Sequence, residues 1–301
     1  MTITPEEVLQ WFASAERDLP WRAAGVTPWQ ILVSEFMLQQ TPVARVLPIW
    51  SSWVQRWPTP SATAAATPAD VLRAWGKLGY PRRAKRLHEC ATVIARDFAD
   101  VVPDDVAVLE QLPGIGSYTA RAVAGFAYGK PVPVVDTNVR RVIARAVHGR
   151  AEAGTASAKR DHADAGELLA LLPDERAARF SAALMELGAI VCTARAPRCG
   201  ECPLRDECRW RQAGSPADPA VKRPIQRFAG TDRQVRGRLL DVLRDNATAV
   251  TRTELDLAWP AHPDQRERAL NSLLDDGLVE QLGDGRFALP GQDRNDSTAS
   301  R

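Results

Sequence analysis

The stretch CTARAPRCGECPLRDEC, residues 192–208, holds four of the five cysteines of this 301-residue chain. Its spacing is Cys192-x6-Cys199-x2-Cys202-x5-Cys208, and the first cysteine ends a predicted helix, SAALMELGAIVC. Four thiolates this close suit either Zn²⁺ or a [4Fe–4S] cluster, because soft sulfur ligands select both. Structural zinc more often uses two CxxC pairs of similar internal spacing, whereas this pattern is asymmetric.

The formal net charge is only +2, so its distribution is more informative than its total. Between Arg195 and Arg238, eleven lysines and arginines face five acidic residues, and a second basic cluster, RRAKR, spans Arg82–Arg86. Local basic patches on a near-neutral protein fit a polyanionic partner, although each patch alone could equally be solvated arginine on an exposed face.

No apolar run is long enough to cross a membrane, and the first residues, MTITPEEVLQ, do not have the pattern of a signal peptide. Scattered thiols stay reduced in the cytosol, where clustered thiols usually bind metal. We therefore expect a cytoplasmic protein without membrane contacts. Cys90 lies outside the cluster and is expected to be a buried, inert thiol.

The pattern of apolar residues is helical almost throughout, and no convincing strand precedes residue 275. Thr27 is a candidate N-cap for a helix that starts at Pro28. Residues 213–231 are rich in Pro, Gly and Ala and predict a linker. Residues 232–290 predict three short helices and a hairpin turning at 283–285, which resembles a winged-helix module and could also be a plain helical appendage. Residues 291–301 predict a disordered tail.

A second motif, LPGIGSYTA, spans Leu112–Ala120. Gly114 and Gly116 flank Ile115 between two predicted helices, and glycines permit a tight turn whose N–H groups point outward at a helix N-terminus. That geometry binds a phosphate without side-chain charge, although an ordinary helix–helix turn is the simpler interpretation.

Two carboxylates are candidates for chemistry. Asp136 in PVPVVDTNVRR follows an apolar stretch and precedes a predicted helix, so it is a natural N-cap. Backbone N–H groups that bind an N-cap carboxylate lower its pKa, so we expect Asp136 to stay ionised and able to stabilise an oxocarbenium-like centre.

Glu35 in LVSEFMLQQT lies in a strongly apolar predicted helix. It is either a structural glutamate paired with an arginine, or a carboxyl whose pKa is raised so that it can act as a general acid. One neutral acid and one charged carboxylate are what cleavage of a glycosidic bond needs.

These motifs together resemble one group of proteins. The cysteine loop and LPGIGSYTA are similar to those of the endonuclease III superfamily of helix-hairpin-helix DNA glycosylases, and SEFMLQQT resembles its adenine DNA glycosylase (MutY) family. Further matches, from about Pro20 to Cys208, are LPW at 19–21, LGY at 78–80, RLH at 86–88, VVDTNVRRV at 134–142 and ELGAIVC at 186–192. The cluster ligands are then Cys192, Cys199, Cys202 and Cys208, and the implied cofactor is [4Fe–4S].

The resemblance implies an all-α, two-lobed helix-hairpin-helix DNA glycosylase over residues 1–212. The small C-terminal module that follows resembles a winged helix by its own pattern. A helical lobe, about 22–130, would carry Glu35, Tyr80 and the hairpin. A cluster lobe, about 1–21 plus 131–212, would carry the iron–sulfur loop, with Asp136 at the junction.

The resemblance also implies a reaction. The enzyme would flip adenine, mispaired with 8-oxoguanine or guanine, out of double-stranded DNA and hydrolyse its N-glycosidic bond. Glu35 would protonate the adenine ring and Asp136 would stabilise the deoxyribose cation, assisted by Tyr118 and Asn138. The residues implied to contact DNA or wedge it open are Leu38, Gln40, Thr41, Tyr80, Leu112, Gly114, Ile115, Gly116 and Arg195. A nucleoid-associated monomer is expected.

Three features qualify this resemblance. Relatives that also cleave the strand carry a lysine in the hairpin to form a Schiff base, but here Tyr118 takes that position, so we expect base excision without strong strand cleavage. Pro81 follows Tyr80 where many members have a second tyrosine, and should stiffen that loop. Residues after Arg209 are too few for the domain resembling MutT that many members use to read 8-oxoguanine.

Two other functions remain open at this stage. A related glycosylase could act on another mismatch, such as thymine opposite guanine, although such relatives lack a glutamate at the position of Glu35. A non-catalytic iron–sulfur DNA-binding regulator with a winged helix would leave the pair Glu35 and Asp136 unexplained.

Overall fold

The computed structural model describes residues 3–217 and 228–292 of the chain, and in these ranges the predicted helical architecture is confirmed. Most of the expected linker and most of the expected tail lie outside the described residues. The helices are α1 (Pro5–Ala15), α2 (Pro28–Leu38), α3 (Val43–Arg56), α4 (Pro60–Ala64), α5 (Pro68–Trp75), α6 (Arg82–Asp97), α7 (Val106–Leu109), α8 (Ser117–Tyr128), α9 (Thr137–Ala146), α10 (Ala158–Leu169), α11 (Asp174–Ile190), α12 (Arg209–Gln212), α13 (Asp232–Asp245), α14 (Arg252–Ala258) and α15 (Pro263–Asp275), with single 3₁₀ turns at Pro20–Arg22 and Cys199–Glu201.

The chain divides into two compact units, each discontinuous in sequence. Unit 1 comprises Met1–Ile31, Asp104–Gln111 and Ile115–Arg223, and unit 2 comprises Leu32–Pro103, Leu112–Gly114 and Pro224–Arg301. Helix α8 therefore groups with the cysteine loop, and the C-terminal module groups with α3–α6, whereas the lobes expected from the sequence divide the chain differently. The lobe boundaries stay a prediction.

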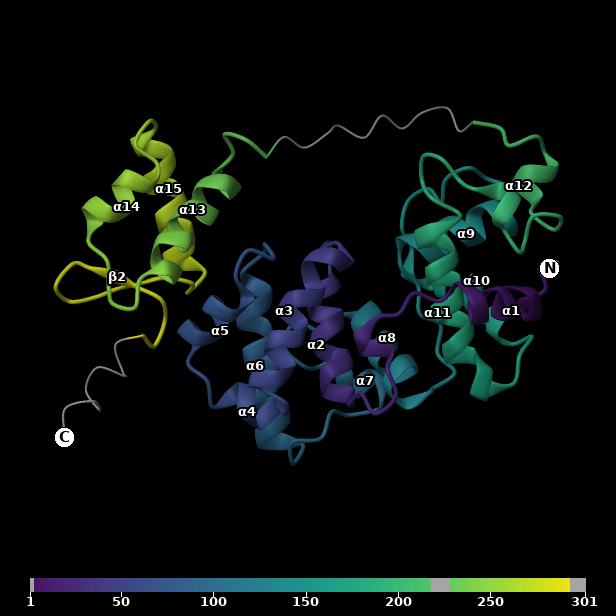
Figure 1. Ribbon diagram of the computed structural model, residues 1–301, viewed down its shortest axis with the longest axis horizontal. Helices are drawn as coiled ribbons and strands as arrows, with labels where there is room; N and C mark the ends of the chain where they lie inside the picture. Colours follow the sequence, from purple (N-terminus) through teal and green to yellow (C-terminus); the bar gives the residue numbers. More distant parts are fainter. Residues whose placement is uncertain (1–2, 218–227, 293–301) are drawn as a thin grey trace. The chain divides into compact units, whose positions relative to one another are not determined.

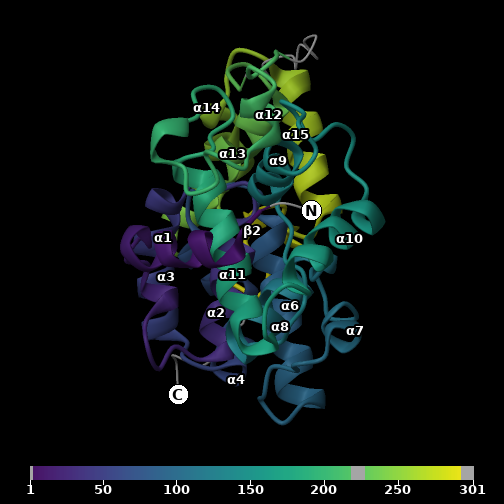
Figure 2. The same ribbon diagram turned by 90° about the vertical axis from the view of Figure 1, so that its right-hand side faces the viewer.

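The core of unit 1 forms where α1, α9 and α11 pack together, and Figures 1 and 2 show α1 beside α11. Phe12 of α1, Val139 of α9 and Phe180 of α11 are buried in it. Glu186 of α11, only 1% exposed, receives Arg17 (Nε to Oε1, 2.5 Å) and Arg22 (Nη2 to Oε2, 3.1 Å). This ion cluster fastens the segment that follows α1 to the central helix of the unit.

Unit 2 is built on a layer of short helices in which α6 packs against α4 and α5 (Figure 1). The Trp53 ring packs edge to face against Trp57 and Trp75, with ring centroids 4.8 and 6.0 Å away, respectively. Thr59 and Thr67 are the N-caps of α4 and α5. Their side-chain hydrogen bonds define where these short helices begin.

The C-terminal module contains the three predicted helices, α13–α15, and the predicted hairpin. Strands β1 (Glu280–Gln281) and β2 (Phe287–Ala288) pair antiparallel around a turn in which Gly285 has φ +83°. Val250 forms an isolated bridge to Phe287, and among the described residues no strand precedes residue 275, as predicted. A single bridging residue has no periodicity that a sequence pattern could reveal.

Within residues 3–217 and 228–292, no helix is long and apolar enough to cross a membrane.

Candidate active site

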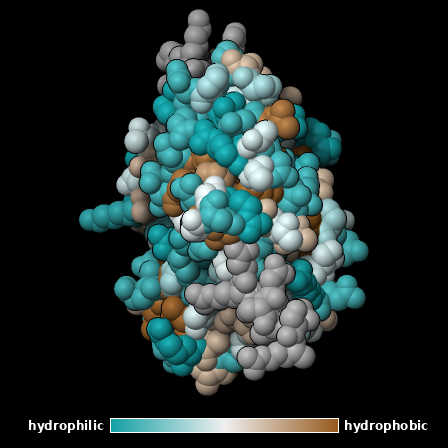
Figure 3. All heavy atoms as spheres, turned by 90° about the vertical axis from the view of Figure 1, so that its left-hand side faces the viewer, coloured by the Kyte–Doolittle hydropathy of each residue, from teal (hydrophilic) through white to brown (hydrophobic). Residues whose placement is uncertain are grey.

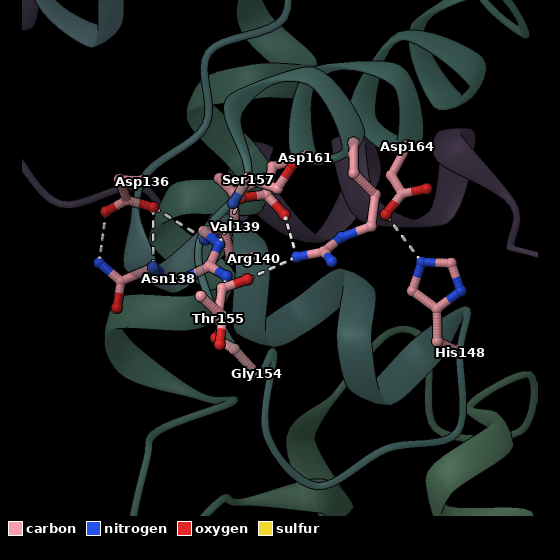
Figure 4. Close-up of polar contacts among 11 residues, drawn as sticks. Asp136, Asn138, Val139, Arg140, His148, Gly154, Thr155, Ser157, Asp161 and Asp164 are labelled. Atoms are coloured by element: carbon pink, nitrogen blue, oxygen red, sulfur yellow. Dashed lines mark hydrogen bonds and ion pairs between the residues drawn. The ribbon is translucent and has the colours of Figure 1, made fainter. Parts of the chain in front are cut away.

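Asp136 is the N-cap of α9, as predicted. Its Oδ1 accepts hydrogen bonds from the backbone N–H groups of Asn138 and Val139, both at 2.8 Å, and its Oδ2 accepts one from Asn138 Nδ2 at 2.7 Å. Figure 4 shows the carboxylate facing these donors at the start of the helix. Three donors fix the orientation of the carboxylate. It can still accept a further hydrogen bond, because a carboxylate has about four lone-pair sites.

The expected pKa of Asp136 was wrong in direction. Burial raises the pKa of this carboxyl above its ordinary value, and the hydrogen bonds from Val139 and Asn138 and the charge of Arg141 reduce the rise without reversing it. The sequence identified the capping bonds, but it gave no measure of how fully the fold removes this carboxylate from water.

Arg141 joins the Asp136 network to the cysteine loop. Its Nη2 donates to Asn138 Oδ1 at 2.7 Å and to the Gly188 carbonyl at 2.6 Å, while its Nε donates to the Cys192 carbonyl at 2.7 Å. Gly188 is required here, because a Cβ at that position would lie 2.6 Å from Asn138 Cβ. The close approach of α9 and α11 therefore positions Asn138 and, through it, Asp136.

The neighbouring Arg140 has a different partner. Its Nε lies 2.8 Å from Asp161 Oδ2, and its Nη2 donates to the Gly154 carbonyl at 3.1 Å, so it supports the connection between α9 and α10 (Figure 4). His148 lies 2.9 Å from Asp164 in the same connection.

Glu35 lies in unit 2 on α2, and its side chain is 6% exposed. Leu32, Phe36 and Met37 around it are at most 1% exposed. The predicted cap of this helix is present, because Thr27 exchanges hydrogen bonds with Gln30. The prediction that this glutamate stands in a strongly apolar helix is therefore confirmed.

Arg83 of α6 organises the segment after α2, and the sequence did not identify it. Its guanidinium donates to the carbonyls of Phe36 at 3.0 Å and Met37 at 3.2 Å, to the Gln39 carbonyl, and to Thr41 Oγ1 at 2.9 Å. These bonds satisfy the last carbonyls of α2, which have no partner inside the helix. Burial lowers the pKa of Arg83 to about 10.

The proposed DNA-contacting residues near α2 differ in accessibility. Gln40 is exposed in a left-handed conformation with φ +53°, and Leu38 is half-buried. Thr41 is 7% exposed and its hydroxyl accepts a hydrogen bond from Arg83, so it supports the segment after α2 from the protein interior.

Tyr80 is the exposed residue of a second loop. It is 45% exposed, has φ +49°, and stacks over the Arg83 guanidinium at 5.2 Å. Pro81 follows as the N-cap of α6 with φ −62°, a value that its ring fixes. Thus Arg83 lies under both Tyr80 and the segment after α2.

The LPGIGSYTA hairpin places its glycines as expected. Leu112 and Ile115 are buried, so their contribution to a binding surface is through the main chain. Gly114 has φ +79°, and a Cβ there would lie 2.7 Å from Arg86 Cβ. Gly116 is the exposed N-cap of α8, which begins with Ser117 and Tyr118.

The four cysteines of residues 192–208 line one pocket of about 300 Å³, its open mouth included. Cys192, Cys202 and Cys208 pack against the core of unit 1. Arg145 of α9, 3% exposed, donates to Cys192 Sγ at 3.4 Å and to the Thr193 carbonyl at 2.7 Å. A buried cation thus supports the loop beside its first sulfur.

The donor set fits an iron–sulfur cluster, because four thiol side chains line one pocket and soft sulfur ligands hold such clusters. Burial raises the pKa of the Cys202 thiol to about 12. Ligation requires the thiolate form, which the positive charge of bound iron would stabilise.

The basic cluster at Arg82–Arg86 is mostly engaged in contacts within the protein, and its interpretation as a nucleic-acid patch stays a prediction. Arg82 pairs with Asp276, Lys85 donates to the Asp276 carbonyl, and Arg86 pairs with Glu89. In the cysteine loop, Arg198 and Arg205 pair with acidic neighbours while Arg195 is exposed.

Comparisons with known proteins agree with this geometry. Residues 33–164 match the model of the HhH-GPD superfamily of base excision DNA repair proteins, and residues 192–208 match the iron-sulfur binding domain of endonuclease III. An adenine DNA glycosylase from Mycobacterium tuberculosis is 69% identical over 96% of this chain and 94% of its own length. The chain belongs to the adenine DNA glycosylase family. The predicted [4Fe–4S] cofactor and the predicted glycosylase class are thereby confirmed.

Solved structures support the same fold. A thermostable thymine-DNA glycosylase matches with a TM-score of 0.63 at 27% identity, over 69% of this chain and 95% of its own. An endonuclease III–DNA complex matches with a TM-score of 0.60 at 23% identity, over 71% of this chain and 99% of its own. This member of the adenine DNA glycosylase family therefore has the helix-hairpin-helix glycosylase fold and is a DNA-acting enzyme.

Proposed function

We propose that this enzyme excises adenine mispaired with 8-oxoguanine or guanine in double-stranded DNA, by hydrolysis and without strong strand cleavage. The opposing base, the monomeric state, the nucleoid association and the residue roles below are parts of this proposal. Its organisation would be a glycosylase domain over 1–212, a linker over 213–231 and a small module over 232–290.

Two carboxylates, one in each unit, carry the proposal. Asp136 is held by Asn138 and the start of α9, so an ionised carboxylate there would face the sugar with its orientation fixed. Glu35 is buried in an apolar helix, which suits a general acid that protonates the departing adenine. Tyr118 would assist this chemistry.

Recognition of the lesion would use the exposed residues around Arg83. Adenine is inaccessible inside a stacked duplex, so the enzyme must flip the base out and fill or widen the gap. Leu38, Gln40 and Tyr80 are proposed to contact the opposing base or wedge the duplex, and the exposed Gly116 would bring its backbone to a phosphate.

The absence of a lyase step rests on the hairpin. Tyr118 occupies the position at which strand-cleaving relatives have lysine. Lys130, the nearest lysine along the chain, is 2.6 Å from Asp104 at the other end of α8. No amine of the hairpin itself is then available to form a Schiff base with the sugar.

A single-turnover assay tests this function. The substrates would carry one A:8-oxoguanine, A:G, G:T or A:T pair, and half of each sample would receive alkali to break abasic sites. We expect alkali-dependent cleavage of the adenine strand at A:8-oxoguanine and A:G only, lost in Glu35→Gln. Cleavage at G:T would instead support the alternative function, a thymine glycosylase. This alternative is tested because a thymine-DNA glycosylase is among the structures similar to this chain, at 27% identity.

The matched control is Glu186→Gln, which makes the same change at another buried glutamate. Because Glu186 binds Arg17 and Arg22, this variant should lose thermal stability while its folded fraction keeps excising adenine. A cluster-bearing wild type that binds all four duplexes and cleaves none would support the non-catalytic DNA-binding regulator instead.

A further inference from the structure

The loop that carries Tyr80 has an unusual backbone. Gly76, Gly79 and Tyr80 all have positive φ, at +53°, +85° and +49°. For Tyr80 this conformation costs energy, and such strain persists only where surrounding contacts impose it. Trp75 Nε1 and Arg83 Nη2 both donate to the Gly79 carbonyl, at 3.0 and 3.2 Å, and hold one side of the loop.

The C-terminal module contacts the chain directly after this loop. Asp276 at the end of α15 binds Arg82 on the first turn of α6, and also Arg236 Nη2 at 2.6 Å. Lys85 Nζ donates to the Asp276 carbonyl at 3.0 Å. The Asp276 side chain is only 9% exposed, whereas Arg82 is 68% exposed. The buried carboxylate therefore fixes an arginine that otherwise extends into solvent.

The module also contacts the helix directly before the loop. Arg244 Nε donates to the Leu72 carbonyl at 3.1 Å, and Arg73 Nη2 donates to the Asn246 carbonyl at 3.0 Å. At the other end of the module the Pro290 carbonyl accepts a bond from the Ala69 N–H at 3.0 Å. The module thus holds both the helix that enters the loop and the helix that leaves it.

The module lacks the charge of a DNA reader. Residues 232–290 contain eleven acidic residues against eight arginines. Arg266 on α15 is 8% exposed and pairs with Asp256, so it is unavailable to a phosphate. Figure 3 shows the side of the molecule on which the module lies in Figure 1, and that side is mostly hydrophilic with scattered apolar patches. Neither a basic stripe nor a continuous apolar surface explains this module.

We propose that the C-terminal module is an intramolecular brace for the Tyr80 loop, and that Asp276 is the positioning residue through which it acts on Arg82 and Lys85. This inference rests on the proposed function, because it takes Tyr80 to be a residue that contacts the lesion. The brace would preserve the exposed, left-handed conformation of Tyr80 before DNA arrives, so that DNA binding does not have to supply the cost of ordering the loop.

A double-mutant cycle in the full-length, cluster-bearing enzyme tests this, with Arg82→Gln, Asp276→Asn and the double variant. We expect faster amide hydrogen exchange over residues 76–85 in all three. Excision from A:8-oxoguanine at limiting enzyme should fall about tenfold, and the rate at saturating enzyme should change less than about twofold. The double variant should be no worse than Asp276→Asn alone, since that variant already removes the Arg82–Asp276 pair.

Glu267→Gln is the matched control, because Glu267 pairs with Arg252 inside the module and touches neither α5 nor α6. It should leave exchange over 76–85 unchanged. If Asp276→Asn loosens the module itself, α13 amides will exchange faster too, and Arg82→Gln then decides, because it leaves the Arg236–Asp276 pair intact.

Unchanged exchange over 76–85 in Arg82→Gln overturns the brace. If the wild type is active, faster exchange over residues 76–85 together with unchanged excision at limiting enzyme also overturns the brace. Additive losses would instead identify Arg82 as a direct phosphate contact. Should the wild type excise nothing, the proposed function fails, while the exchange data still decide whether the module braces the loop.

Discussion

Arg141 donates a hydrogen bond from its Nε to the carbonyl oxygen of Cys192 at 2.7 Å. The same guanidinium binds Asn138 Oδ1, and Asn138 binds Asp136. Cys192 and Asp136 are therefore joined by three consecutive hydrogen bonds within unit 1, so under the proposed function the cysteine loop would support the chemistry as well as shape a surface.

This relationship predicts the effect of Arg141→Gln. The shorter amide cannot bind Asn138 and Cys192 together, so Asp136 should lose its fixed orientation. We expect single-turnover excision of adenine to slow about tenfold or more, with iron content reduced. Arg140→Gln is the control on the same helix, since its partners are Asp161 and Gly154. Equal loss in both variants would point to general disruption of α9.

The raised pKa of Asp136 predicts two opposite pH effects. If the reaction uses the Asp136 carboxylate as proposed, excision should decline as pH falls through a pKa above the ordinary 3.8. The folded state binds this proton more tightly than the unfolded state. The stability contributed by Asp136 is thus present below the unfolded pKa and is lost as pH rises through the folded one.

Asp136→Asn separates these two effects. Asparagine caps a helix as well as aspartate does, and it carries no charge to bury. We expect this variant to melt at a higher temperature than the wild type at neutral pH, with the gap closing toward about pH 4. Its excision rate should fall about a thousandfold. A lower melting temperature at neutral pH would contradict the raised pKa.

The two hairpin glycines should behave differently. Gly114→Ala requires a positive φ of alanine and brings Cβ against Arg86 and Phe36, so we expect a loss of about 2 kcal/mol in the free energy of unfolding. Gly116→Ala meets no protein atom within 4 Å. It should leave stability nearly unchanged and weaken DNA binding, because the methyl group would lie where a phosphate approaches. Denaturant titration and fluorescence anisotropy with labelled duplex measure the two effects.

Removal of a cluster ligand should affect unit 1 first. Cys199→Ser is expected to abolish the iron–sulfur absorbance and to expose the core beside Cys192, Cys202 and Cys208, seen as faster exchange in α9 and α11. Cys90→Ala is the control. Burial raises the pKa of Cys90 to about 12, so this thiol is inert, and the variant should keep its absorbance and lose only about 1 kcal/mol of stability. An unchanged spectrum in Cys199→Ser would remove this residue from the ligand set.

The sequence was most informative where a local pattern determines local structure. The cap of Asp136, the turn at Gly114 and the cysteine spacing are all short-range features, and each lies where it was expected. Glu35 and Glu186 look alike in sequence, since both stand in apolar helices. That Glu186 pairs with Arg17 and Arg22, residues more than 160 positions away, could not be predicted from the sequence around it.

Long-range partners are what the sequence could not supply. The basic run showed the charges of Arg82 and Lys85, but not that Asp276, almost 200 residues further on, binds both. Arg83 lies in the same basic run, yet its partners are carbonyls at the end of α2. Carbonyls carry no sequence signature, so the role of a buried arginine that caps a distant helix is visible only in the fold.

The ion cluster of Arg17 and Glu186 has a consequence for biosynthesis. The two residues are separated by 169 positions, so on a ribosome that adds about 5–20 residues per second the first waits roughly 10–30 s for the second. During that time α1 has no α11 to cover Phe12, and unit 2 can begin to fold from the stretch between them. Chaperone binding to the nascent N-terminal segment would protect this interval, and iron–sulfur assembly would then be among the last events in the maturation of the enzyme.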